Sequence, residues 1–104
     1  MRVSVSHTKP KEEVIRAVDR SFDDLFRGSV GIPLKIENER RSWTGSRMTF
    51  SFDARAGILS APIKGTVDVT ERDLIIEADL GLLERLLGGG ARQTIESRVK
   101  GLLK

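Results

Sequence analysis

The chain of 104 residues contains no cysteine and no tyrosine, and it has one histidine and one tryptophan. The lack of cysteine excludes disulfides, thiolate metal sites and thiol catalysis, and it is compatible with a reducing compartment. A lone histidine is a poor metal candidate, because metal sites are built from several ligands of this kind. We therefore expect neither a metal nor another cofactor.

Long apolar runs are absent as well. No segment approaches the roughly 18 consecutive apolar residues of a membrane span. The first residues, Met-Arg-Val-Ser-Val-Ser, lack the apolar core of a signal peptide, so we expect a cytoplasmic protein. A length of 104 residues with 38% hydrophobic and 32% charged residues is typical of one globular domain, which we expect to cover residues 1–104.

Neither sign of charge dominates, because the 18 lysines and arginines are nearly balanced by 15 aspartates and glutamates, which leaves a net charge of +3. The main basic group comprises Lys35, Arg40, Arg41 and Arg47, and it surrounds Trp43. Two glutamates interrupt this group, and sheets that bind RNA need exposed aromatic residues, which are scarce here. We interpret the group as a charged sheet edge that opposes aggregation, and we do not expect nucleic-acid binding.

Apolar residues recur with two different periods, and these periods predict the order of the elements. Alternation over residues 2–6 predicts a strand, and helical spacing over residues 14–26 predicts a helix that ends near Gly28. Alternating residues predict four more strands between residues 31 and 80, with Pro62 at an edge or a bulge. A final helix is expected from about residue 91, with an apolar side formed by Ile95, Val99, Leu102 and Leu103.

This order of strand, helix, four strands and helix predicts an α+β domain. We expect a curved antiparallel sheet of about five strands with an N-terminal and a C-terminal helix packed on one face. The other face of the sheet carries polar residues and should meet water, as antiparallel sheets allow. The architecture is helix-grip-like in outline, and this analogy carries no function by itself.

Residue patterns typical of catalysis are absent. His7 lies between the first strand and the first helix, and we interpret it as a surface or capping residue. Catalytic carboxylates need burial to shift their pKa, and nothing in the pattern buries the carboxylates that are neighbours here. Those neighbours are Glu12 and Glu13, then Asp23 and Asp24, then Asp68, Glu71 and Asp73. The sequence has no Gly-x-Ser-x-Gly motif, and we do not expect an enzyme.

The last third of the chain holds the strongest candidate for a binding surface. Leu82, Leu83, Leu86 and Leu87 would share one face of a short helical turn, with a charged rim formed by Arg85, Arg92 and Arg98. Glycines 88–90 follow without the Lys-Ser or Lys-Thr of a phosphate-binding loop, and we interpret them as a flexible break. Two interpretations of the leucines stay open. They plug one end of the core, or they form an apolar patch that docks on a hydrophobic surface or another subunit.

Two strand motifs carry a resemblance to a known family. Trp43-Thr-Gly-Ser-Arg-Met-Thr-Phe resembles the tryptophan–x–glycine strand of the polyhydroxyalkanoic acid system family, and Ile63-Lys-Gly-Thr-Val-Asp-Val resembles its Gly-x-Ile-x-Val strand. The opening helix and the closing segment from Leu80 occupy matching places, so the resemblance covers nearly the whole chain. The chain departs from the family in a longer segment between Phe52 and Ile63 and in its three glycines.

The resemblance implies a small non-enzymatic protein of polyhydroxyalkanoate storage, granule-associated or regulatory, with no catalytic residues to carry over. A polyester granule presents an apolar surface, which agrees with the docking interpretation of the leucines. We therefore expect binding to the granule surface or to a granule protein. The alternative is a small carrier that holds a fatty-acid-like or hydroxyacyl ligand between the sheet and the helices. A homodimer through a strand edge or through the leucines is compatible with either function.

Overall fold

The computed structural model describes residues 1–27, 35–79 and 90–103. Within these ranges, the helices and strands follow the order that the sequence predicts. They are β1 (Arg2–Ser6), α1 (Lys11–Arg27), β2 (Lys35–Thr44), β3 (Arg47–Ala56), β4 (Leu59–Val69), β5 (Asp73–Asp79) and α3 (Gly90–Leu102).

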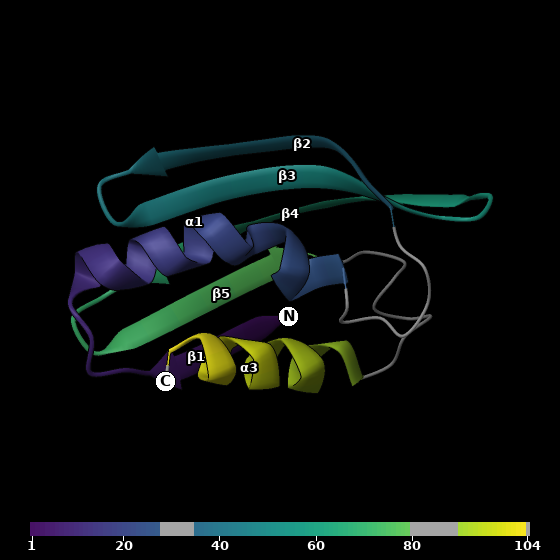
Figure 1. Cartoon of the computed structure of the whole chain (residues 1–104). Coiled ribbons are helices and arrows are strands. Elements are labelled where there is room, and N and C mark those ends of the chain that lie inside the picture. Colours follow the sequence, from purple (N-terminus) through teal and green to yellow (C-terminus); the bar gives the residue numbers. More distant parts are fainter. Residues whose placement is uncertain (28–34, 80–89, 104) are drawn as a thin grey trace.

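The five strands form one antiparallel sheet in the spatial order β1-β5-β4-β3-β2. Strands β2 to β5 follow one another as neighbours, and β1 completes the sheet by pairing with β5. Both helices lie on one face of this sheet, and α3 packs against β1 and α1 (Figure 1). The predicted α+β architecture, with both helices on one face of an antiparallel sheet, is confirmed.

The core lies between the helices and the sheet. Helix α1 contributes Val14, Val18 and Phe22, and α3 contributes Ile95 and Val99, each at most 1% exposed. Their spacing of four residues places them on the side of each helix that faces the sheet. The strands contribute every second residue, and the largest of these are Met48, Phe50, Phe52, Ile63, Leu74 and Ile76.

Two hairpins of the sheet use turns of the same length and the same first residue. Gly45 and Ser46 connect β2 to β3, and Gly57 and Ile58 connect β3 to β4. Both glycines have a φ of +61°, which glycine adopts without steric cost. A glycine at the first of two turn residues suits the twist of antiparallel strands. The two turns therefore form a matched pair that differs in its second residue, serine or isoleucine.

The β3–β4 hairpin extends beyond the strands on either side of it (Figure 1). Among the described residues, the pair of β2 and β3 nearest the turn is Lys35 with Arg55, and that of β5 and β4 is Asp79 with Lys64. Among the described residues, the first part of β4 therefore pairs with β3 alone. Pro62 lies in this part and pairs with Asp53 of β3, and its predicted place at an edge or a bulge stays a prediction.

Strand β2 forms one edge of the sheet and is interrupted by a bulge. Its pairing with β3 shifts register between Glu37 and Arg40, and Asn38 has a φ of 54°. Bulges and charged side chains on an edge strand hinder its pairing with another chain. The bulge therefore disfavours a dimer through this edge of the sheet.

Candidate interaction surface

The predicted docking surface falls mainly on a segment that is not described. Four leucines and one arginine of it, Leu82, Leu83, Leu86, Leu87 and Arg85, lie outside the described residues. Arg92 and Arg98 of the predicted rim are described, and both side chains are exposed on α3. Both interpretations of the leucines, as part of the core or as a binding surface, therefore stay predictions.

The two described rim arginines hold α3 against its neighbours. Arg92 donates from Nε to the carbonyl oxygen of Arg2 at 3.0 Å, which connects α3 to β1. Arg98 donates from Nη1 to the carbonyl oxygen of Asp24 at 3.0 Å, which connects α3 to α1. These bonds give both arginines a structural role in addition to the predicted one at a binding surface.

Apolar exposure in the described ranges is concentrated at the end of the β3–β4 hairpin. Ile58 is 100% exposed and Leu59 is 55% exposed, and they are the exposed large hydrophobic residues among the side chains whose burial the structure describes. Leu59 has the inward-facing parity of Ala61 and Ile63, which are buried. It is exposed because the hairpin here has passed the end of the sheet. The sequence feature that could have revealed this exposed pair is its position directly after Gly57, in a turn where polar residues are more usual.

A hollow of about 720 Å³ lies at the base of this hairpin. Its polar lining includes Arg40 and Lys64 but also Asp53 and Asp79, so neither sign of charge dominates. Ser51, Asp53, Pro62 and Lys64 alternate with the buried residues of β3 and β4, so they belong to the face away from the helices. Phe52, Ala61 and Ile63 of the inner face also line the hollow, so most but not all of its lining lies on the face away from the helices.

The space between α1 and the sheet is filled by an aromatic cluster. The ring centroid of Phe22 lies 5.1 Å from that of Phe50 and 6.1 Å from that of Phe52, in edge-to-face geometry. The rings of Phe50 and Phe52 stack at 6.1 Å, and all three residues are at most 2% exposed. Aromatic pairs at these distances stabilise a core beyond their burial. This packing weighs against a carrier that would hold its ligand beneath α1.

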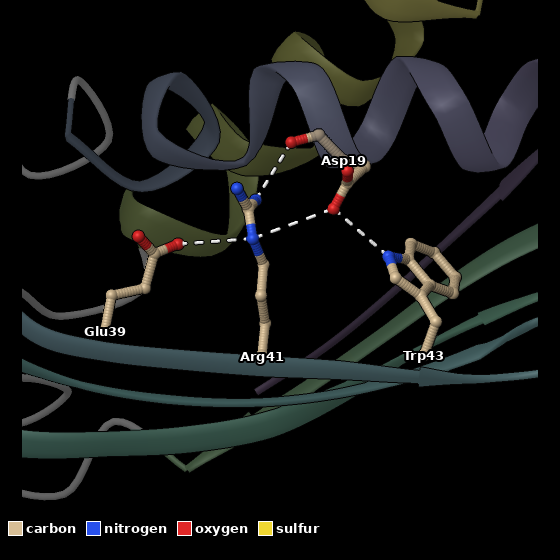
Figure 2. Close-up of polar contacts among 4 residues, drawn as sticks. All are labelled: Asp19, Glu39, Arg41 and Trp43. Atoms are coloured by element: carbon tan, nitrogen blue, oxygen red, sulfur yellow. Dashed lines mark hydrogen bonds and ion pairs between the residues drawn. The ribbon is translucent and has the colours of Figure 1, made fainter.

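A polar clamp joins α1 to the edge strand β2 (Figure 2). The indole N–H of Trp43 donates to Oδ1 of Asp19 at 3.1 Å, and Nε of Arg41 lies 3.6 Å from the same oxygen. Arg41 also donates from Nη1 to the carbonyl oxygen of Asp19 at 2.9 Å, and its Nε lies 3.7 Å from Oε1 of Glu39. Its guanidinium carbon is 5.2 Å from the ring centroid of Phe22, within range of a cation–π contact.

The clamp engages the residues that a nucleic-acid site would need. Trp43 is partly buried with its N–H bonded, and Arg41 is bound to the helix. Arg47, which belongs to the same basic group, faces Asp68 with 3.4 Å between Nε and Oδ1. These contacts favour the interpretation of this group as a structural sheet edge.

His7 is buried at 7% exposure, so the part of the prediction that placed it at the surface is wrong. Its Nε2 lies 2.9 Å from the carbonyl oxygen of Thr70, and its Nδ1 accepts from the backbone N–H of Lys9 at 3.2 Å. Donation to a carbonyl by one nitrogen and acceptance by the other require a neutral ring protonated at Nε2. The ring thus connects the loop after β1 to the β4–β5 turn, and its bond to Lys9 caps that loop locally.

Among residues 1–27, 35–79 and 90–103, no three His, Asp or Glu side chains come together as potential metal ligands. Neither helix in these ranges has the length and apolar composition needed to cross a membrane. Comparisons with protein-family models, with curated proteins and with solved structures found no match. The functional proposal is therefore based on the sequence resemblance and on the surface of the chain itself.

Proposed function

We propose that this protein is a non-enzymatic component of a polyhydroxyalkanoate storage system that binds an apolar surface. The partner is the granule surface or a protein on it. The sequence resemblance to the polyhydroxyalkanoic acid system family suggests the biological setting. The physical mode of action is suggested by the surface of the domain.

The observation that carries this proposal is the exposure of Ile58 and Leu59 together at the end of a projecting hairpin. A single exposed hydrophobic residue is ordinary on a protein surface, whereas contiguous exposed apolar surface, to which two adjacent residues contribute here, favours a contact site. Complete burial of an isoleucine side chain contributes about 1.5–3 kcal/mol, so the fold leaves this free energy for a partner. The predicted leucine surface of residues 82–87 would add to it.

The test is co-sedimentation of the purified protein with washed polyhydroxyalkanoate granules. Phosphatidylcholine vesicles serve as a neutral control surface, and an unrelated basic protein of similar size controls for adsorption. We expect recovery of the protein with the granules at a level above both controls. Equal recovery with the granules and in their absence would contradict the proposal. Protease-treated granules, compared with untreated ones, separate binding to the granule surface from binding to a granule protein.

A further inference from the structure

We infer that the β3–β4 hairpin inserts end-on into an anionic phospholipid surface, with Ile58 and Leu59 in its apolar layer. This inference rests on the proposed function and names the partner within it, a lipid-coated surface in place of a granule protein. Three observations on the hairpin support it: the residue in its turn, its reach, and the charges at its base.

The turn does not require an isoleucine. Ser46 occupies the equivalent position in the β2–β3 turn, after a glycine with the same φ of +61°. Ser46 therefore demonstrates that a small polar residue suits this turn, and serine is among the residues that turns favour. Ile58 contacts nothing that buries any of its side chain, because it is 100% exposed. Its apolar side chain thus points to a role outside the fold.

The reach of the hairpin suits an interfacial depth. The pair formed by Lys35 and Arg55 is the last one between β2 and β3 among the described residues, and the chain continues through Ala56 to Gly57. Two residues at a rise of about 3.4 Å place the turn roughly 7 Å beyond this pair. Segments that bind at a membrane interface bury their apolar side about 5–10 Å into the boundary between headgroups and acyl chains. The pair would then lie at the level of the headgroups.

The charges near the turn favour an anionic surface. Between Ala54 and Ile63 the chain carries Arg55 as its single charged residue. Lys35 lies beside Arg55 in the sheet and is exposed. Nη1 of Arg55 is 3.3 Å from Oε1 of Glu37, in an exposed pair that screening by salt weakens. A basic residue near an anionic membrane strengthens binding by about fivefold.

The acidic residues of the hairpin base lie farther from the turn than Lys35 and Arg55. Asp53 precedes Gly57 by four residues, and its Oδ2 accepts from Nδ2 of Asn38 at 2.8 Å. Asp79 pairs with Lys64, which follows Ile58 by six residues. A surface approached by the turn would therefore meet the apolar residues first, then the basic pair, and the carboxylates last.

The first test compares binding to vesicles of phosphatidylcholine alone and of phosphatidylcholine with phosphatidylglycerol. We expect the wild-type protein to bind the anionic vesicles reversibly, and Ile58→Ser to lower the binding constant about tenfold or more. Far-UV circular dichroism of Ile58→Ser should match the wild type, since Ser46 already forms the same turn. Ser46→Ile controls for apolar content, because it adds an isoleucine to the hairpin turn at the opposite end of β3.

The charges are tested in the same assay at low salt. In the double variant Lys35→Gln, Arg55→Gln, the binding constant for the anionic vesicles should fall by up to about fivefold for each charge removed. Arg2→Gln is the matched control for Arg55, because Arg2 is also exposed and pairs with a glutamate, Glu77, at 3.5 Å. This control should leave binding within twofold of the wild type if the end of the sheet that carries the turn faces the lipid.

A fluorescent reporter locates the inserted residue directly. Ile58→Trp places an indole at the turn, while wild-type Trp43 pairs with Met48 at the other end of β3. With brominated phosphatidylcholine in the anionic vesicles, we expect a blue shift and quenching for Ile58→Trp beyond those of the wild type. The wild-type protein is the matched control for the emission of Trp43.

Each outcome decides a different point. If the wild type binds anionic vesicles while Ile58→Ser binds equally well and the introduced indole stays unquenched, another surface makes the contact and the inference is overturned. If the protein sediments with granules but with neither type of vesicle, the lipid surface is excluded while the proposed function stands. If it binds neither granules nor vesicles, both the inference and the proposed function fail.

Discussion

The indole N–H of Trp43 on the edge strand β2 donates a hydrogen bond of 3.1 Å to the carboxylate of Asp19 on α1. The same carboxylate faces Arg41, so one side chain of the helix holds two residues of the strand. Most side chains of β2 are exposed, and the strand buries little apolar surface of its own. The polar clamp thus explains how a polar outermost strand stays attached to the helical layer.

Replacement of Asp19 should loosen this attachment. We expect Asp19→Ala to destabilise the domain by about 1 kcal/mol, because it removes hydrogen bonds to a charged group at a partly exposed site. Urea unfolding followed by far-UV circular dichroism measures the change, and the emission of Trp43 reports the loss of its partner. Asp24→Ala on the same helix is the control, since the bond of Arg98 uses only the backbone of Asp24. Equal stability of Asp19→Ala and wild type would show that the clamp contributes nothing.

Gly65, at the centre of β4, has no space for a side chain. A Cβ there would collide with the carbonyl oxygen of Glu77 and would lie 2.8 Å from Cα of Ala78 and 2.9 Å from Cζ of Phe50. Because two of these atoms belong to a paired backbone, we expect Gly65→Ala to cost more than about 3 kcal/mol. Thermal unfolding by circular dichroism tests this expectation.

The control for this change is Gly101→Ala in α3, where a Cβ would meet nothing within 4 Å. Alanine is a better helix former than glycine, so the free energy of unfolding of this variant should rise by up to about 0.5–1 kcal/mol. If Gly65→Ala were as stable as Gly101→Ala, the neighbouring strands would have moved apart to admit the Cβ at little cost in free energy. That result would contradict the expected collision.

His7 should contribute to stability through its two hydrogen bonds. His7→Ala leaves the carbonyl of Thr70 and the N–H of Lys9 without a partner, and we expect a loss of about 1–3 kcal/mol. His7→Gln can retain a donor toward Thr70 and should recover part of the loss. Urea midpoints of the three proteins test this order. Ser4→Ala, at an exposed position on β1, should stay within about 0.5 kcal/mol of the wild type.

The predicted leucine surface can be tested by replacing its four leucines together with serine. If Leu82, Leu83, Leu86 and Leu87 dock on granules, the variant should keep the wild-type circular dichroism spectrum and lose co-sedimentation. Polar residues cost little at an exposed site, whereas buried leucines contribute about 2–5 kcal/mol each. An unfolded variant would therefore assign the leucines to the core and remove the basis for docking through them.

The order and type of the elements were predictable because they follow from local patterns. Alternation of period two over β3 to β5 and spacing of three or four residues in α1 and α3 each determine which side chains can share a face. Pro62 was predicted at an edge or a bulge for the equally local reason that it lacks an N–H. The packing of both helices on one face follows from the single apolar face of the sheet.

The candidate surface was less predictable. Composition alone was enough to predict the leucines of residues 82–87 as a candidate binding surface. Ile58 and Leu59 did not, because an apolar pair beside a strand looks like the start of that strand. Only the relative lengths of β2, β3, β4 and β5 show that this pair lies beyond the end of the sheet, and strand length is decided by pairing with neighbours.

Local patterning in the sequence was thus enough to specify an α+β domain with a polar outer face and an apolar inner one. The tertiary structure decided what depends on residues distant along the chain. It buried His7 between the β1–α1 loop and the β4–β5 turn, it bonded Trp43 to Asp19, and it left Ile58 exposed. Periodicity specifies the face on which a side chain lies, whereas burial and hydrogen-bond partners depend on which other segments reach that face.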